Sequence, residues 1–131
     1  MQKTKIFYVE DDLDDVFIFL HEFSQDPHFE VTHFDDSIIF LKHLQQLDGR
    51  DLPDIILTDY RMPKLNGLDL VSKIRSNAKF SDITLAIYST TIYPVQEADC
   101  LGAGADFCIQ KPQSLNDYAR LLRRLKEVAT S

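Results

Sequence analysis

The chain has 131 residues and a mass of 15.1 kDa, which is the size of one compact domain and too small for two. Hydrophobic residues make up 44% of the chain, enough to build a core, so a disordered protein is excluded. Its 21 acidic and 14 basic residues give a formal net charge of −7, which repels nucleic acid. We therefore expect residues 1–131 to form a single domain with no direct nucleic-acid binding.

Two cysteines, Cys100 and Cys108, and the absence of a signal-like apolar stretch near the start indicate a reducing compartment. The longest apolar runs, such as residues 16–20, are far shorter than the roughly 20 residues that cross a bilayer. We expect a cytoplasmic protein with free thiols and no membrane-spanning segment.

Short runs rich in β-forming residues alternate with longer stretches of helical periodicity. The predicted strands span residues 5–9, 29–34, 54–58, 84–88 and 106–109. Three of them contain continuous apolar runs, at residues 6–9, 55–57 and 85–88, which is typical of strands covered on both faces. Strands and helices that alternate in this way predict an α/β fold with a parallel sheet and helices on both of its faces.

Between the strands, apolar residues recur at helical spacing. The predicted apolar faces are Val16, Phe17, Leu20 and Phe23; Ile38, Leu41 and Leu44; Leu70, Val71 and Ile74; Val95, Ala98 and Leu101; and Leu115, Tyr118, Ala119, Leu122 and Leu125. The fourth helix, over residues 94–101, has the weakest face, and Gly102 and Gly104 are expected to end it. Ser114 and Asp117 resemble a capping box for the fifth.

Polar side chains follow four of the predicted strands. Glu10 and Asp11 come after the first strand, Asp59 after the third, Ser89 after the fourth and Lys111 after the fifth. Ligands of open parallel sheets bind at this edge. Two carboxylates about 4 Å apart repel by roughly 4 kcal/mol at an effective dielectric near 20, so the site needs a cation, and Mg²⁺ suits a small oxygen-lined site. Asp59 is then a candidate nucleophile for phosphoryl transfer.

Five motifs extend this pattern over nearly the whole chain. They are Phe7-Tyr8-Val9-Glu10-Asp11-Asp12, residues 55–63 followed by Gly67, Ser89, Gly102-Ala103-Gly104-Ala105-Asp106, and Lys111-Pro112. Together and in this order they resemble the receiver domains of bacterial two-component response regulators, particularly the single-domain, chemotaxis-type members. The resemblance implies a doubly wound, flavodoxin-like (βα)5 fold with five parallel strands in the order 2-1-3-4-5.

The resemblance also implies a role for each site residue. Asp59 is the implied phosphoacceptor, and Mg²⁺ is held by Asp11, Asp59 and the backbone carbonyl of Arg61, with Glu10 acting through water. Lys111 is implied to pair with the phosphoryl group through a loop with a cis Lys111–Pro112 bond. Ser89 is implied to turn inward and hydrogen-bond the same group.

By the same resemblance, the protein is a phosphorylation-controlled signalling module of a two-component phosphorelay, and it catalyses only its own phosphorylation and dephosphorylation. The implied donor is a sensor histidine kinase or a histidine phosphotransfer protein. The implied output is a changed surface on the fourth helix, fifth strand and fifth helix that signals to an unknown partner protein, from a monomer or a phosphorylation-dependent dimer. The chain departs from the commonest family pattern at a few positions: Cys108 stands where an aromatic switch residue is usual, and Thr90 stands where a smaller residue commonly borders the phosphorylation site.

Three other interpretations compete with this one. Acids after the first strand could simply cap a helix, a role that we expect for Asp12 or Asp14. A flavin-phosphate-binding module needs a glycine- and hydroxyl-rich loop where the chain has acids. A phosphohydrolase that uses an aspartyl intermediate would place its nucleophile after the first strand.

Overall fold

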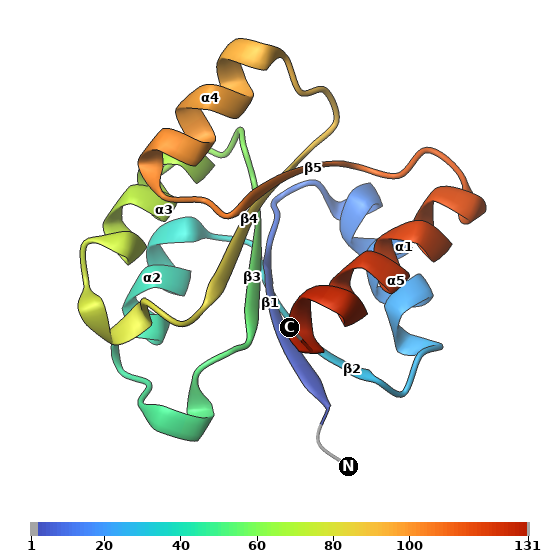
Figure 1. The fold of residues 1–131 in the computed structure, drawn as a ribbon, viewed down its shortest axis with the longest axis horizontal. Coiled ribbons are helices and arrows are strands. Elements are labelled where there is room, and N and C mark those ends of the chain that lie inside the picture. Colours follow the sequence, from blue (N-terminus) through green and yellow to red (C-terminus); the bar gives the residue numbers. More distant parts are fainter. Residues whose placement is uncertain (1–2, 131) are drawn as a thin grey trace.

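A computed structural model describes residues 3–130 (Figure 1). Its five parallel strands are β1 (Thr4–Val9), β2 (Phe29–Phe34), β3 (Ile55–Asp59), β4 (Thr84–Ser89) and β5 (Phe107–Gln110). They form one sheet in the order β2-β1-β3-β4-β5, which confirms the predicted doubly wound sheet and its strand order. No helix within the described residues is long and apolar enough to cross a membrane.

Four α-helices connect the strands, and a fifth follows β5. They are α1 (Leu13–Ser24), α2 (Ser37–Gln45), α3 (Gly67–Arg75), α4 (Pro94–Ala103) and α5 (Leu115–Thr130), with short 3-10 helices η1 (Gly49–Asp51) and η2 (Ala78–Phe80). Helices α1 and α5 cover one face of the sheet, and α2, α3 and α4 cover the other (Figure 1). Each strand-to-strand connection therefore carries a covering helix, as parallel strands require.

Two hydrophobic cores lie on the two faces of the sheet, and β3 contributes to both. Ile55 and Leu57 pack with α1 and α5, whereas Ile56 between them packs with α2 and α3. All three are almost completely buried, because successive side chains of a strand point to opposite faces. The continuous apolar run that predicted a central strand thus reflects burial on both sides.

Side chains at the helix ends satisfy the first free N–H groups. The Asp12 carboxylate accepts hydrogen bonds from the backbone N–H groups of Asp14 and Asp15, which confirms the capping role expected for Asp12. The N–H of Asp117 donates to Ser114 Oγ at 3.1 Å, but the Asp117 carboxylate accepts from Gln113. The predicted cap at Ser114 is therefore present without the full reciprocal box.

The predicted apolar faces of α1 and α5 are partly wrong. The Phe17 side chain is 76% exposed, and Phe19 takes the buried place. At the start of α5, Leu115 is 70% exposed, and Leu121 lies in the core instead. Both helices carry more apolar residues than one face can hold, so the spacing alone did not fix which of them turn inward.

The predicted face of α4 is wrong. Val95, Ala98 and Leu101 are exposed, and Cys100 is the residue that enters the core. Gly102 lies inside the helix rather than at its end. Gly104 does end the helix, in the left-handed conformation with φ of 117°, as predicted.

Candidate functional site

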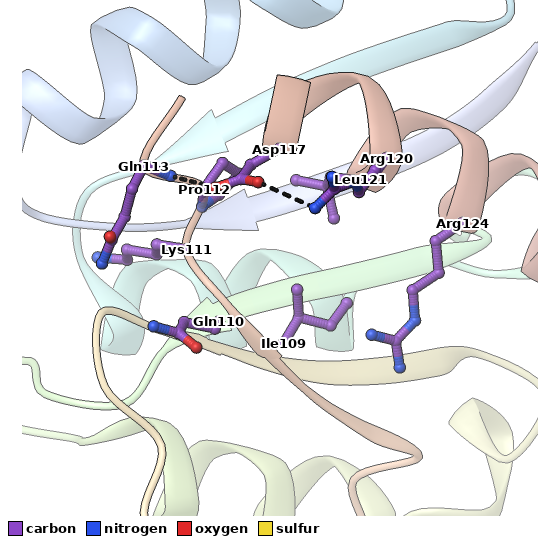
Figure 2. A pocket seen from close by; sticks show the side chains of 9 residues that line it. All are labelled: Ile109, Gln110, Lys111, Pro112, Gln113, Asp117, Arg120, Leu121 and Arg124. Atoms are coloured by element: carbon purple, nitrogen blue, oxygen red, sulfur yellow. Dashed lines mark hydrogen bonds and ion pairs between the residues drawn. The ribbon is translucent and has the colours of Figure 1, made fainter. Parts of the chain in front are cut away.

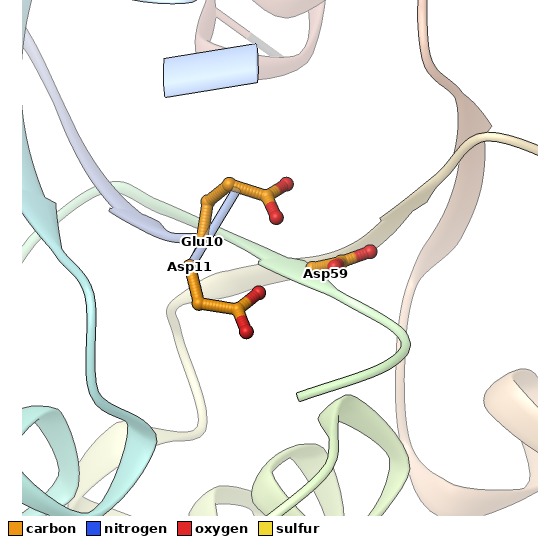
Figure 3. Close-up of side chains that lie close together, drawn as sticks. All are labelled: Glu10, Asp11 and Asp59. Atoms are coloured by element: carbon orange, nitrogen blue, oxygen red, sulfur yellow. The ribbon is translucent and has the colours of Figure 1, made fainter. Parts of the chain in front are cut away.

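Two neighbouring strands bring three carboxylates together. Residue Val9 of β1 pairs with Thr58 of β3, so the residues that follow each of them emerge side by side at the same edge. One carboxylate oxygen each from Glu10, Asp11 and Asp59 lies within 4.8 Å of the others (Figure 3). Such a cluster of oxygen donors is what Mg²⁺ or another hard divalent cation prefers.

Glu10 is the buried member of this cluster, with no exposed surface. Burial, with a further contribution from the nearby Asp59 carboxylate, raises the pKa of its carboxyl group to about 7, although hydrogen bonding to Lys111 acts to lower it. The backbone carbonyl of Glu10 lies 2.8 Å from His33 Nε2. Glu10 is therefore held at two points: its backbone carbonyl contacts His33, and its carboxylate contacts Lys111.

Lys111 brings an ammonium group into contact with the carboxylates. Its Nζ lies 2.7 Å from Glu10 Oε1, 2.8 Å from Asp15 Oδ2 and 3.5 Å from Asp59 Oδ1, and its side chain is only 10% exposed. Burial acts to lower the pKa of Lys111, but the hydrogen bonds to Asp15 and Glu10 outweigh it and hold the pKa above its ordinary value. Lys111 thus stays charged in the site.

The Lys111–Pro112 peptide bond is trans, so the expected cis bond is wrong. The backbone N–H of Lys111 donates to the carbonyl of Ser89 at 2.7 Å, continuing the β4–β5 pairing past the end of β5. This hydrogen bond and the side-chain ion pairs direct Lys111 into the site without a cis bond.

Asp59 lies at the end of β3 and faces a cavity of about 540 Å³. Its Oδ1 accepts a hydrogen bond from the N–H of Tyr60 at 2.8 Å, which holds the carboxylate at the mouth of the strand. Asp11, Arg61 and Lys111 line the same cavity. Asp59 therefore faces the cavity together with one acidic residue, Asp11, and two basic residues, Arg61 and Lys111.

Ser89 also lines this cavity, but its hydroxyl does not turn toward Asp59. Ser89 Oγ donates to the backbone carbonyl of Thr91 at 3.1 Å, within its own loop. The structure thus places Ser89 at the edge of the site, as predicted, but its hydroxyl donates to the Thr91 carbonyl rather than into the site.

Cys108 lies on β5, at the predicted switch position, and packs against the core that contains the buried Cys100. Both thiols are free, as expected. Burial raises the pKa of Cys100 to about 12 and also raises the pKa of Cys108. Thiols that stay protonated are poor nucleophiles, which fits a packing role for both.

Two contributors to the site were missed by sequence reasoning. Asp15 contacts Lys111, and its signal was an acid one helical turn after Asp11. Gly67 lies so close to β3 that a Cβ atom there would be 2.2 Å from the backbone oxygen of Asp59. Gly67 belongs to one of the sequence motifs, but its close approach to Asp59 depends on the three-dimensional path of the loop.

A second cavity, of about 340 Å³, lies between β5 and the start of α5 (Figure 2). Arg120 and Arg124 line it, and Asp117 pairs with Arg120 at 3.4 Å. The Arg124 guanidinium lies over the Phe107 ring, 5.2 Å from its centroid. Asp117 is the one carboxylate among the described residues that line this cavity. The cluster of carboxylates that could bind a metal lies at the Asp59 cavity instead.

The sequence is similar to those of known response regulators. A family model described as the response regulator receiver domain matches residues 6–123. The two-component response regulator ORR11 of Oryza sativa subsp. indica is 31% identical over 97 residues, covering 74% of this chain and 64% of that protein. Chemotaxis protein CheY1 of Helicobacter pylori is 35% identical over 68 residues, covering 52% of this chain and 55% of that protein. The matches span less than two thirds of each relative's length.

Solved structures share the fold. The phosphorylated cyanobacterial phytochrome response regulator RcpA has a TM-score of 0.84 at 23% identity, with 99% of this chain and 96% of that chain covered. The receiver domain of sensor histidine kinase PA1611 from Pseudomonas aeruginosa PAO1, with a magnesium ion coordinated in its active site cleft, has a TM-score of 0.82 at 22% identity, with coverage of 99% and 100%. At such identities the likeness establishes the fold.

Proposed function

The chain belongs to the family of response regulator receiver domains, and on this premise we propose that it is a phosphorylation-controlled signalling module that accepts a phosphoryl group on Asp59. The observation that carries the proposal is the convergence of Glu10, Asp11 and Asp59 within 4.8 Å beside the Lys111 ammonium. We further propose that residues 1–131 act as a single receiver domain, which is supported by the family match over residues 6–123.

The donor atoms of the site fit a hard divalent cation, for which we propose Mg²⁺. Asp11, Asp59 and the backbone carbonyl of Arg61 would hold the ion, with Glu10 acting through water. When bound, the ion supplies positive charge that offsets carboxylate repulsion and neutralises the oxygens of a transferring phosphoryl group. The fit rests on the oxygen donors that β1 and β3 bring together.

In the proposed reaction, a carboxylate oxygen of Asp59 attacks the phosphorus of a phosphohistidine. The new P–O bond forms as the donor's P–N bond breaks, and the imidazole leaves with the electron pair and takes a proton from solvent. Lys111 donates hydrogen bonds to the oxygens that gain charge. Ser89 releases the carbonyl of Thr91 and donates to the phosphoryl group, because its hydroxyl lines the same cavity. In the reverse step, water attacks the phosphorus, the P–O bond to Asp59 breaks and inorganic phosphate leaves, so the domain catalyses its own phosphorylation and dephosphorylation.

The proposed donor is a sensor histidine kinase or a histidine phosphotransfer protein, and the proposed output is a changed α4–β5–α5 surface that a partner protein recognises. Ser89 and Cys108 form the proposed switch. Because Cys108 packs a small thiol where an aromatic ring is usual, movement of Ser89 meets little steric resistance at that position. Exposed Val95 and Leu101 on α4 give this surface apolar area for a partner. We place the protein in the cytoplasm, as a monomer or a phosphorylation-dependent dimer.

Incubation with acetyl phosphate and Mg²⁺, followed by intact-mass and peptide mass spectrometry, tests this function. We expect one acid-labile phosphoryl group on Asp59, no label after Mg²⁺ is removed by EDTA, and none in Asp59→Asn. Asp35→Asn is the matched control, because Asp35 is an exposed acid that follows β2 at the same edge of the sheet. Labelling of Asp59→Asn to the wild-type level, or hydrolysis of acetyl phosphate that continues at the wild-type rate in Asp59→Asn, would contradict the proposal.

A further inference from the structure

Asp15 holds the ammonium group on which the proposed phosphorylation site depends. The Nζ of Lys111 lies 2.8 Å from Asp15 Oδ2 in a direct hydrogen bond, but 3.5 Å from Asp59 Oδ1. Asp15 comes from the first turn of α1, whereas Asp59 ends β3, so two separate elements share one cation. The Lys111 ammonium therefore lies closer to the Asp15 carboxylate on α1 than to the Asp59 carboxylate on β3.

The supply of hydrogen-bond donors at Lys111 is limited. An ammonium group has three N–H donors. Glu10 and Asp15 lie within 2.8 Å of Nζ, and the Lys111 side chain is only 10% exposed, so water has little access to it. Glu10 and Asp15 thus occupy two of the three donors. A phosphoryl group on Asp59 brings three acceptor oxygens, so it can gain a second donor only in competition with these carboxylates, of which Asp15 is one.

The first turn of α1 fixes Asp15 in this position. Its backbone N–H donates to the Asp12 cap at 3.2 Å, and the N-terminal end of a helix favours a negative charge. Asp15 also lines the same cavity as Asp59, where its charge repels an incoming anion. Competition for Lys111 and charge repulsion therefore both weaken the binding of a phosphoryl group at Asp59.

We propose that Asp15 is a positioning residue that holds Lys111 toward α1 and thereby weakens the binding of a phosphoryl group at Asp59. This inference rests on the proposed function, since it concerns the regulation of the same site. Phosphorylation then transfers a donor of Lys111 from Asp15 to the phosphoryl group and loosens the contact between the β5–α5 loop and α1.

The test uses the full chain with saturating Mg²⁺ and beryllofluoride, a stable mimic of the phosphoryl group, titrated by ¹⁹F NMR. We expect Asp15→Asn to bind beryllofluoride about tenfold more tightly than the wild type, the size of one charge-assisted hydrogen bond in a partly exposed site. Asp15→Ser, which also lacks the charge, is expected to show a gain in the same direction. Asp14→Asn is the matched control, because it removes the same charge from the neighbouring, exposed position of α1. It should bind like the wild type.

A second readout is the ¹⁵N resonance of Lys111 Nζ, which a purely structural role of Asp15 would not move. Asp15→Asn should shift it in the beryllofluoride-free protein, and Asp14→Asn should leave it unchanged. Unchanged or weaker beryllofluoride binding by Asp15→Asn, an equal gain in Asp14→Asn, or an unmoved Nζ resonance would each overturn the inference. If the wild type itself fails to bind beryllofluoride, the proposed function fails as well, so the two failures are distinguishable.

Discussion

The charges in the site do not balance at the level of single residues. Glu10, Asp15 and Asp59 lie within 3.5 Å of the Lys111 ammonium, and Asp11 adds a fourth carboxylate close to Glu10 and Asp59. Burial and the Asp59 carboxylate raise the pKa of Glu10, which is the expected response of a carboxyl group that has too little positive charge nearby. Such an excess of negative charge is unfavourable for folding alone, and a bound divalent cation offsets it.

Alanine substitutions at two glycines, Gly67 and Gly102, should have opposite effects on stability. Gly67→Ala should lower the free energy of unfolding by about 1–3 kcal/mol and slow labelling of Asp59, because its Cβ would meet the backbone of β3 at 2.2 Å. Gly102→Ala, inside α4 with open space around the added methyl group, should raise the free energy of unfolding by up to about 1 kcal/mol. Urea unfolding and labelling by acetyl phosphate check both, and equal effects of the two substitutions would contradict the described path of the loop.

Among the helices, α4 is held mainly at its C-terminal end. Cys100 is its buried residue, and Gly104 caps it above the side chain of Arg75. Arg75, at the end of α3, donates to the carbonyl of Gly104 at 2.8 Å and pairs with Asp106 at 2.8 Å. The N-terminal half of α4 has exposed apolar residues and follows the loop that begins directly after Ser89, the last residue of β4. It is therefore the part of the helix that can move at the lowest cost when Ser89 turns.

An ion pair between elements gives a prediction about pH. Lys126 Nζ on α5 lies 2.6 Å from Asp26 Oδ2 in the loop after α1, and the hydrogen bond to Lys126 is the main cause that lowers the pKa of Asp26. A carboxyl group whose pKa is lower in the folded state stabilises the fold above its unfolded pKa, near 3.8, and loses this contribution as the pH falls. Asp26→Asn should therefore lower the free energy of unfolding at pH 7 by up to about 1 kcal/mol, and by less at pH 3.

Urea unfolding at both pH values checks this expectation. Asp82→Asn, at an exposed site, serves as the control and should change stability equally little at either pH. A loss of stability in Asp26→Asn that grows as the pH falls would contradict the assigned sign.

For the molecule as a whole, the sequence was most informative where several constraints coincide. The continuous apolar runs of β1, β3 and β4 predicted the central strands, and the parallel sheet then placed Glu10, Asp11 and Asp59 at one edge. The strand ends could be predicted because the side-chain direction in a strand and the shared direction of parallel strands leave few alternatives.

Other features could not be predicted because they depend on tertiary contacts. The exposed Val95 and the buried Cys100 of α4 depend on how this helix is rotated against α3 and β5, and its spacing allowed both rotations. The contact of Asp15 with Lys111 joins α1 to the loop after β5, which are 96 positions apart in the chain. The spacing of Asp15 from Asp11 places an acid near the site, but it does not reveal which basic side chain that acid contacts.

In the proposed function, β1 and β3 together form one acidic site that binds a single divalent cation. Calorimetric titration with Mg²⁺ in the absence of any phosphodonor tests it most directly, with wild type, Asp11→Asn and the exposed-site control Asp35→Asn. We predict one ion per wild-type chain, binding weakened by at least about tenfold in Asp11→Asn, and unchanged binding in Asp35→Asn. Equal Mg²⁺ affinity in the wild type and Asp11→Asn would contradict the account.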